Sequence, residues 1–293
     1  MNDTVRHTVC PLLAALIWGF AFSAQSVCAD FLGPFSVNAG RGLIAFVILL
    51  AACLLRRRRS GKKGLSRELL LGSLCCGTAL FIASNFQQFG LADTDAGKAG
   101  FITALYIVLV PIAGIFMGKK LSAKVWLAVL IAVVGMYFLC ISDDFSLAFS
   151  DLMVLICALM FTVQIVSVDL FVQKVDSVEL SCGMFFFEAL FSGIGVLLFE
   201  SPTLAGVQGC IWQLLYVAVF SSCIAYTLQI VAQKGANTAV VSLLLSLESV
   251  FALIGGAVFL HEKLSGRELL GCAIMLAAIV LAEWPERDRA RTA

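Results

Sequence analysis

Long apolar runs, each about 20 residues in length, follow one another along almost the whole chain. A helix of that length crosses the hydrocarbon core of a bilayer, and within lipid a helix satisfies all of its own backbone hydrogen bonds. Stretches such as Leu43–Leu55 are continuously apolar, whereas the strands of a membrane barrel alternate apolar and polar residues. The sequence therefore predicts an all-α, polytopic membrane protein. Its ten expected transmembrane helices are Val9–Val27, Phe35–Leu55, Leu69–Leu91, Gly97–Met117, Val125–Ile141, Leu152–Val172, Leu180–Phe199, Ile211–Val231, Thr238–Leu260 and Glu268–Trp284.

The shortage of charge supports this fold class. Charged residues make up 13% of the 293 residues and hydrophobic residues 61%, whereas soluble domains contain about 25% charged residues. This composition excludes a soluble enzyme, a disordered tail and a nucleic-acid-binding protein, and the net charge of +1 offers no surface for a polyanion. Ten spans take up roughly 200 residues, which leaves no room for a soluble domain. The first run also fits a cleaved signal peptide, because it follows Arg6, but it is long enough to span the bilayer.

The distribution of lysine and arginine predicts the orientation, because cytoplasmic loops carry an excess of both. With the N-terminus inside, sixteen of the 20 basic residues fall in the inner tails and loops, and Arg41 falls within a span. The acidic connection Ser142–Asp151 falls on the outer side. We therefore expect both termini in the cytoplasm. The inner set is Arg6, Arg56–Arg59, Lys62, Lys63, Arg67, Lys119, Lys120, Lys124, Lys174, Lys234, Arg287, Arg289 and Arg291, and the outer set is Lys98, Lys263 and Arg267.

Two short motifs recur in the same order in the two halves of the chain. Phe22–Asp30 is similar to Phe161–Asp169, 139 residues later, and Lys120–Lys124 is similar to Lys263–Arg267, 143 residues later. These matches predict a duplication of five helices into ten. Since five is odd, the second half enters the membrane in the opposite sense, and inverted repeats of this kind build alternating-access transporters around a midplane site. We expect a first repeat at 1–141, a second, inverted repeat at 151–284 and a short cytoplasmic tail at 285–293.

Three charged residues lie well inside the predicted spans: Arg41, Glu188 and Glu248. A charge at the centre of the membrane costs about 2.5–3.5 kcal/mol on insertion scales, so each of them should face a partner or water. Glu248 would recognise a substrate ammonium group or a coupling proton, and the alternative is a structural ion pair or a hydrogen bond to a serine such as Ser246. Arg41 would bind a substrate carboxylate through its planar fork, and the alternative is that it neutralises Glu188.

Aromatic and amide side chains within the spans extend the candidate substrate site. The amphipathic aromatic residues in mid-span are Trp18, Tyr106 and Tyr226. They would offer a ligand a stacking surface and a polar group, or they pack against other helices. Weaker candidates are Asn85, Gln88 and Gln229, together with Glu188. Amides at such positions most often form hydrogen bonds between helices.

Proline, small residues and cysteines add to this picture. Pro111 should kink the fourth span near the midplane, where a kink can serve gating. Ala15, Gly19 and Ser23 recur at a spacing of four residues and form a seam that permits close helix packing. The 11 cysteines are scattered, without a Cys-x-x-Cys pair or a cluster of histidines. The sequence therefore predicts no metal, redox centre or other cofactor.

Several motifs together point to a known family. They are Trp18-Gly19-Phe20, the in-span Arg41, Ala96–Thr103 opening the fourth span, Ser246–Ala252 in the ninth and His261–Ser265 after it. The pattern resembles EamA-type transporters of the drug/metabolite transporter superfamily over nearly the whole chain. In three places the chain departs from the family pattern: Ser249 follows Glu248 where the family has proline, His261 stands where it has glycine, and Lys119 stands where it has glutamate. The resemblance implies two tandem modules of five helices in a bacterial inner-membrane carrier that exports amino acids or other small metabolites.

A membrane-embedded enzyme is the competing class of function, and a lipid-handling protein is a third. The histidines, His7 and His261, are predicted on opposite sides of the membrane, and the sequence carries no nucleophile elbow or phosphate-binding loop. We therefore expect a secondary active transporter rather than an enzyme, driven by a gradient and surrounded by the lipid bilayer. Its partner would be a small-molecule substrate, with a proton as the candidate coupling ion, and it would act as a monomer or a homodimer. The expected site lies between the halves, near Trp18, Arg41, Tyr106, Tyr226 and Glu248.

Overall fold

The structure is a computed structural model that describes residues 2–3, 5–60, 64, 66–140, 148–261 and 265–284. All regular structure in these ranges is helical, which confirms the predicted all-α class. The end of the predicted span Val125–Ile141, most of the acidic connection Ser142–Asp151 and the tail at 285–293 lie outside the described residues. So do the basic residues Lys62, Lys63 and Lys263.

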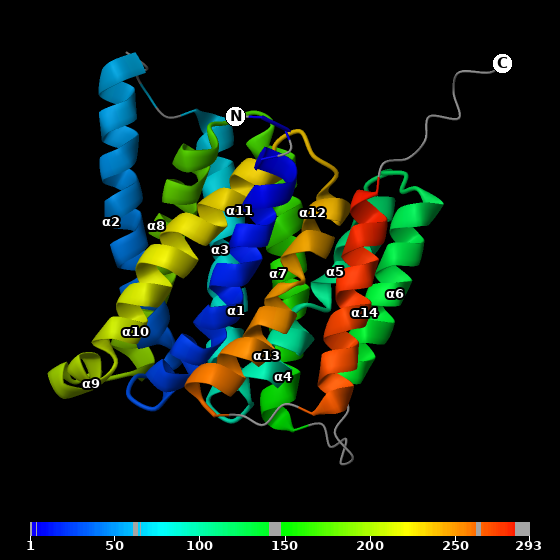
Figure 1. Cartoon of the computed structure of the whole chain (residues 1–293). Coiled ribbons are helices and arrows are strands. Elements are labelled where there is room, and N and C mark those ends of the chain that lie inside the picture. Colours follow the sequence, from blue (N-terminus) through cyan, green and yellow to red (C-terminus); the bar gives the residue numbers. More distant parts are fainter. Residues whose placement is uncertain are drawn as a thin grey trace.

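Helices follow one another from residue 5 to residue 283 (Figure 1). Two π-helical stretches, η1 (Val5–Val9) and η2 (Val217–Ala225), are continuous with α-helices. The helices of the N-terminal half are α1 (Cys10–Ala29), α2 (Pro34–Ser60), α3 (Arg67–Leu91), α4 (Ala96–Thr103), α5 (Tyr106–Phe116) and α6 (Ala123–Cys140). Those of the C-terminal half are α7 (Phe149–Val172), α8 (Ser177–Phe199), α9 (Leu204–Gly209), α10 (Ile211–Tyr216), α11 (Tyr226–Gln233), α12 (Thr238–Leu245), α13 (Glu248–Phe259) and α14 (Gly266–Glu283).

Eight helical segments within the described residues are long and apolar enough to cross a membrane. They are Val5–Ala29, Pro34–Arg58, Arg67–Leu91, Ala96–Phe116, Phe149–Val172, Ser177–Phe199, Ile211–Gln233 and Thr238–Phe259. Two shorter apolar stretches, Ala123–Gly135 and Leu269–Ala282, belong to α6 and α14. The chain is therefore a multi-pass membrane protein.

Side chains near the ends of the helices satisfy the first free backbone N–H groups. Ser66 accepts a hydrogen bond from Leu69 N at the start of α3, and Asp176 accepts from the backbone at the start of α8. The carboxylate of Glu200, directly after α8, accepts from Phe35 N and Ser36 N at 2.9 and 2.8 Å. This last contact joins the start of α2 to the end of α8.

Two of the predicted spans are interrupted near their middle. The span expected at Gly97–Met117 breaks at Ala104 and Leu105, between α4 and α5, and the span at Thr238–Leu260 breaks at Ser246 and Leu247, between α12 and α13. At each break the backbone closes a tighter turn: Ile107 N donates to Ala104 O at 3.0 Å, and Ser249 N donates to Ser246 O at 3.1 Å. Pro111 lies inside α5, so the break of this span comes before the proline that was expected to kink it.

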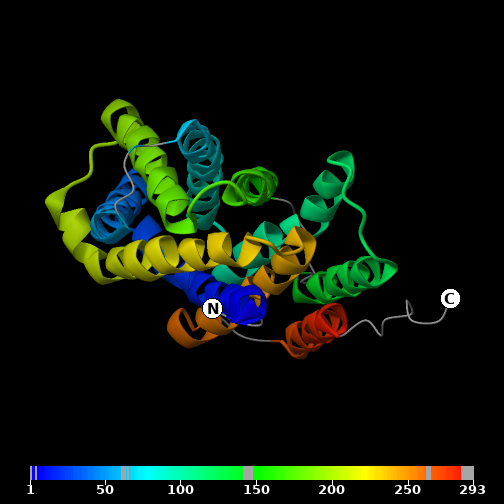
Figure 2. The same ribbon diagram turned by 90° about the horizontal axis from the view of Figure 1, so that it is seen from above.

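The helices pack into an elongated bundle when viewed along their axes (Figure 2). α3 packs against α7 and α8, α2 against α8, and α1 against α13, while α6 and α14 pair with each other. α6 and α14 lie side by side at one edge of the elongated cross-section, as both views show (Figures 1 and 2). α1 begins and α14 ends at the same end of the helices (Figure 1).

The predicted small-residue seam lies where α1 meets α13. A Cβ atom added at Gly19 would lie 2.1 Å from Phe251 Cβ and 2.8 Å from Ala252 N. A Cβ atom at Gly100 of α4 would lie 2.6 Å from Ala252 Cβ. Both glycines therefore let α1 and α4 approach α13 more closely than a residue with a side chain would allow.

Gly19→Ala should lower the stability of the purified protein, because the added methyl group collides with the backbone of α13. We expect a loss of about 1–3 kcal/mol, seen as a lower midpoint of thermal unfolding in detergent. The control is Gly193→Ala in α8, where an added Cβ meets nothing within 4 Å. There the higher helix propensity of alanine should leave stability unchanged or raise it by up to about 1 kcal/mol. Equal midpoints for the two variants would contradict the packing described here.

Candidate functional site

A small cavity lies among the central helices and has a free volume of about 30 Å³. The five residues that the sequence predicts as the principal binding residues all line it, and so does Gln229 from the weaker set. The remaining lining residues are not among the site residues that the sequence predicts. The full lining is Trp18, Phe22, Gln25, Arg41, Gln87, Thr103, Tyr106, Phe161, Gln164, Ile165, Ser221, Tyr226, Gln229 and Glu248.

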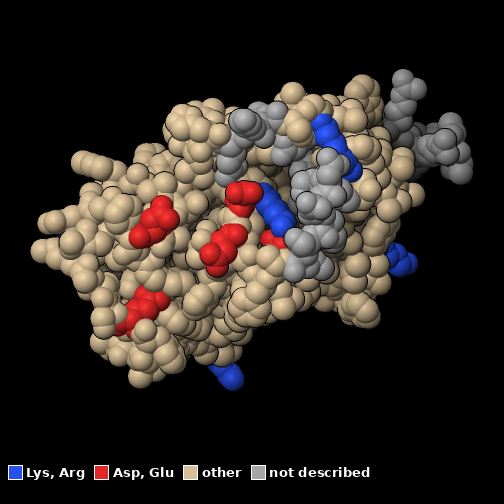
Figure 3. All heavy atoms as spheres, turned by 90° about the horizontal axis from the view of Figure 1, so that it is seen from below, with Lys and Arg blue, Asp and Glu red and all other residues tan. Residues whose placement is uncertain are grey.

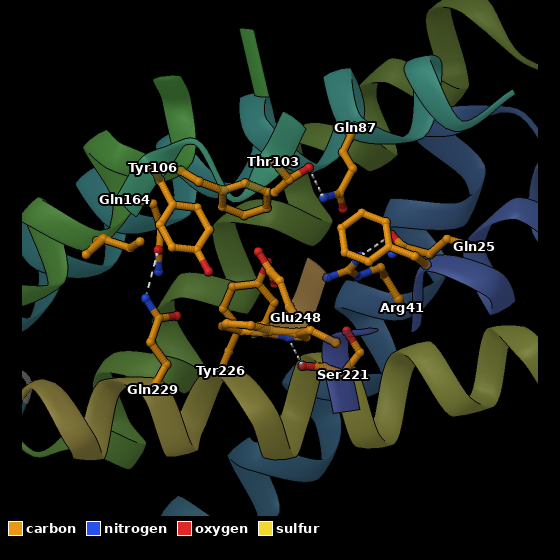
Figure 4. A pocket seen from close by; sticks show the side chains of 14 residues that line it. Gln25, Arg41, Gln87, Thr103, Tyr106, Gln164, Ser221, Tyr226, Gln229 and Glu248 are labelled. Carbon is orange, nitrogen blue, oxygen red and sulfur yellow. Dashed lines mark hydrogen bonds between the residues drawn. The ribbon is translucent and has the colours of Figure 1, made fainter. Parts of the chain in front are cut away.

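The two helix breaks position the side chains in the middle of this cavity. Tyr106 is the first residue of α5 and Glu248 is the first residue of α13. Figure 4 shows both side chains directed into the same space. Glu248 is 4% exposed. Because the N-terminus of a helix carries a partial positive charge, the start of α13 stabilises a carboxylate there.

Arg41 enters the cavity from α2 and is held by neighbours on two other elements. Its Nε donates to Ser222 Oγ at 2.8 Å, and its Nη1 donates to Gln25 Oε1 at 3.0 Å. The guanidinium carbon lies 6.0 Å from the centre of the Tyr226 ring, within the range of a cation–π contact. These contacts fix Arg41 at the edge of the cavity, with only 1% of its surface exposed.

The π-helical stretch η2 supplies part of this setting. Ser222 of η2 accepts the Arg41 hydrogen bond, and Ser221 O accepts one from Trp18 Nε1 at 3.2 Å. The ring of Trp18 meets the ring of Tyr226 edge-on, with their centroids 4.7 Å apart. The wider turns of a π-helix therefore coincide with the wall that holds Trp18 and Arg41, and such stretches are frequent at functional sites.

Amide side chains line the rest of the wall. Gln229 Nε2 donates to Gln164 Oε1 at 3.2 Å, and Gln87 Nε2 donates to Thr103 Oγ1 at 3.3 Å (Figure 4). The sequence signal for Gln87 and Gln164 is that each amide interrupts an apolar run. That signal does not separate a residue lining a cavity from one that only joins two helices.

Three polar atoms on the cavity wall make no hydrogen bond of good geometry among the described residues, although the Tyr106 hydroxyl and the Glu248 carboxylate lie close enough to interact with each other. They are Tyr106 OH, Gln229 Oε1 and one carboxylate oxygen of Glu248, Oε1. A buried polar group without a partner destabilises a protein unless water or a ligand supplies the missing hydrogen bond. The free volume holds about one water molecule. The cavity is therefore small, and its wall carries polar atoms whose hydrogen bonds are incomplete.

The remaining candidates lie outside this cavity. Asn85 is bonded to Asn38 and to Ser192, each at 3.2 Å. Gln88 donates to the backbone of Gln25 at 2.8 Å. Both amides therefore join helices, as such residues usually do. Glu188 is fully buried behind Arg41, with an oxygen 4.0 Å from Arg41 Nε.

Pro111 lines a second, smaller pocket of about 20 Å³ between α5 and α7. Lys119 and Asp169 line the same pocket and form an ion pair with each other. Within the described residues, no group of three or more His, Cys, Asp or Glu side chains is arranged to hold a metal ion.

Comparison with known proteins identifies the class of the chain. The EamA-like transporter family matches two stretches, residues 9–141 and 148–284. An uncharacterized transporter of Archaeoglobus fulgidus is 31% identical over 92% of this chain and 83% of its own length. The uncharacterized transporter YoaV of Bacillus subtilis is 21% identical over 91% of this chain and 92% of its own. A chloroplastic WAT1-related protein of Arabidopsis thaliana is 26% identical over 92% of this chain and 67% of its own.

A solved crystal structure has a similar fold. It covers 94% of this chain and 96% of its own chain with a TM-score of 0.77, at 19% sequence identity. This likeness concerns the fold alone.

Arg41→Lys should destabilise the protein, because lysine lacks the planar fork that reaches Ser222 and Gln25 together. Each hydrogen bond lost from the charged group costs about 1.5–3 kcal/mol. The measurement is the midpoint of thermal unfolding in detergent. The matched control, Arg58→Lys, changes an exposed arginine of the same helix and should leave the midpoint unchanged. If both variants unfold at the wild-type temperature, the contacts of Arg41 do not support the fold.

Proposed function

The chain belongs to the EamA-like transporter family, and we propose that it is a secondary active carrier whose substrate site is the central cavity. The family and its named relatives are transporters rather than enzymes. The observation that carries the proposal is the set of polar atoms on Tyr106, Gln229 and Glu248 whose hydrogen bonds are incomplete. They face the space that Trp18, Arg41 and Tyr226 also line, and a polar ligand would complete their hydrogen bonds.

The chemistry of the cavity favours a small amphipathic metabolite such as an amino acid. Arg41 would bind a carboxylate through its fork, and Glu248 would bind an ammonium group or a proton. The rings of Trp18 and Tyr226 would contact the apolar part of the substrate. Because the free volume is about 30 Å³, the walls must separate before such a molecule can enter.

We further propose that the chain is built of ten membrane spans in two inverted five-helix repeats, at 1–141 and 151–284, followed by a cytoplasmic tail at 285–293. The family matches this chain in two successive stretches of similar length, which supports a duplication. The two helix breaks support it as well, because Tyr106 and Glu248 occupy the same place after the break in their halves. Repeats of this kind exchange inward-open and outward-open shapes around one central site.

Gating in this proposal involves Pro111. Its pocket lies at the end of α5, where the ion pair of Lys119 and Asp169 joins the connection after α5 to α7. Separation of this pair would open the cavity toward that end of the bundle. Since Pro111 has no backbone N–H, α5 has a point at which it bends more easily than an intact helix.

We propose an inner-membrane location with both termini in the cytoplasm and transport in the export direction, and the surface charges support this orientation. Figure 3 shows the end of the bundle opposite the start of α1, where acidic side chains gather. The acidic residues at the helix ends there include Asp30, Asp95, Asp151 and Glu200. Most arginines and lysines lie near the helix ends and connections at the other end of the bundle. An excess of basic residues is typical of cytoplasmic loops.

Purified protein in proteoliposomes should move at least one compound from a panel of amino acids and other small metabolites. Glu248→Gln should lower the rate about tenfold or more, because a hydrogen bond to a buried charge contributes about 1.5–3 kcal/mol. The measurement is flux of labelled substrate with and without an imposed proton gradient. Glu68→Gln, the same change at an exposed residue of α3, serves as the control and should transport normally. A wild-type protein that moves nothing in the panel would contradict the carrier proposal.

The orientation is tested with reporter fusions. A reporter joined after Arg67 should be active only in the cytoplasm, and one joined after Glu200 should be active only outside it, because these residues flank opposite ends of the spans. The reverse pattern would overturn the proposed orientation, and the same compartment for both would overturn the proposed number of crossings between them.

A further inference from the structure

Arg41 has a charged neighbour, Glu188, that does not line the cavity. Glu188 of α8 is 0% exposed and is not among the residues that line the cavity. Its oxygen Oε1 accepts a hydrogen bond from Ser84 Oγ at 3.0 Å, and that oxygen is 4.0 Å from Arg41 Nε. Arg41 therefore borders both an internal carboxylate and the substrate cavity.

The contact between Arg41 and Glu188 is loose. The hydrogen bonds of Arg41 go to Ser222 and Gln25, and the second oxygen of Glu188, Oε2, has no partner among the described residues. A second arginine–glutamate pair on the same two helices, Arg57 and Glu179, is in direct contact at 2.7 Å and is partly exposed. Arg41 and Glu188 therefore attract each other by charge without a direct hydrogen bond, and Oε2 of Glu188 has no hydrogen-bond partner among the described residues.

A carboxylate that enters the cavity and binds Arg41 would compete with Glu188 for one positive charge. Two negative charges would then share a single arginine in a buried setting, where an uncompensated charge is strongly unfavourable. The ionisable groups that face Glu188 are Arg41 from α2 and Tyr226 from α11, and Ser84 from α3 does not ionise. Glu188 is the carboxylate beside Arg41, and it can restore neutrality by taking up a proton, while Glu248 on the cavity wall would pair with the substrate's ammonium group.

We propose that Glu188 is a proton-binding site that exchanges its hold on Arg41 with a substrate carboxylate. When the carboxylate binds Arg41, Glu188 takes one proton from solution and becomes a neutral carboxylic acid. When the substrate leaves, Glu188 releases the proton and again neutralises Arg41. Glu188 is a positioning residue in this scheme, since it acts on the substrate through Arg41. The inference rests on the proposed function, and it restricts the substrate class to compounds that carry a carboxylate.

The test measures proton uptake by the wild-type carrier in weakly buffered detergent solution containing a pH indicator. The probe is a mixture of the eighteen standard amino acids other than aspartate and glutamate, compared with a mixture of their α-amides, which carry no carboxylate. We expect uptake of about one proton per bound amino acid and none with the amides. Because binding takes up a proton, raising the pH should weaken amino-acid binding by up to tenfold per pH unit wherever Glu188 is ionised in the free protein.

Two variants locate the proton. Glu188→Gln should abolish the uptake and make amino-acid binding independent of pH, while Glu188→Asp should restore part of both effects. Glu179→Gln, the same change in the surface pair of the same helices, should behave as the wild type. Uptake that persists in a folded Glu188→Gln protein would overturn the proposal, and the wild-type measurement decides the matter if that variant does not fold.

Failure of this inference can be told apart from failure of the carrier proposal. Amino acids that quench tryptophan fluorescence without proton uptake would overturn the role of Glu188 and leave the carrier intact. Transport in proteoliposomes confined to compounds without a carboxylate would do the same. A wild-type protein that transports no compound of the panel would overturn both.

Discussion

An arginine that is 1% exposed in the middle of a membrane protein sets conditions that many surrounding residues must meet. A buried guanidinium is tolerated only when nearby groups accept its hydrogen bonds and balance its charge. Gln25 from α1, Ser222 from η2 and Glu188 from α8 meet these needs together. Arg41 on α2 therefore joins both halves of the chain in one polar centre.

The same constraint explains why the backbone departs from regular α-helix in three places near this centre. The breaks before Tyr106 and Glu248 begin a new half-helix within the bundle, and η2 widens the helix beside Trp18 and Arg41. Non-helical backbone at membrane depth is tolerated only where it is buried in protein or lines a cavity. Side chains bond backbone carbonyl groups in two of these segments: Trp18 Nε1 donates to Ser221 O of η2, and Ser249 Oγ donates to Ser246 O at the second break.

The sequence predicted the helical class and the multi-pass character, because continuously apolar runs of this length span lipid as helices, whereas barrel strands alternate apolar and polar residues. Short motifs, such as Ala96–Thr103 and Ser246–Ala252, indicated the family. It also selected five residues that line one cavity: Trp18, Arg41, Tyr106, Tyr226 and Glu248. Charged side chains within a span are unfavourable in contact with lipid, so they are expected to face the interior of the bundle or a cavity. It did not predict the breaks at Ala104–Leu105 and Ser246–Leu247, because leucine, alanine and serine occur equally well in uninterrupted helices. It named Gln88 as a candidate and not Gln87, although Gln87 lines the cavity and Gln88 joins two helices, since adjacent residues differ only in the helix face they occupy.

The two ends of the bundle differ in a way that bears on how such a cavity fills. Between α1, α10 and the end of α13 lies a groove of about 420 Å³, lined by Phe20, Ser23, Ala24, Val27, Trp212, Gln213, Tyr216, Phe259 and Leu260. In the proposed inverted repeat α7 corresponds to α1 and α5 to α13, and the pocket between α7 and α5 measures about 20 Å³ and contains the ion pair of Lys119 and Asp169. In the proposed repeat, the space between α1 and α13 is thus wide at one end of the bundle, and the corresponding space between α7 and α5 is narrow at the other.

Since α1 carries Trp18 toward the cavity and Ser23 toward the groove, a shift of α1 against α13 would change both at once. The glycine contacts between α1 and α13 supply a smooth surface on which such a shift can occur.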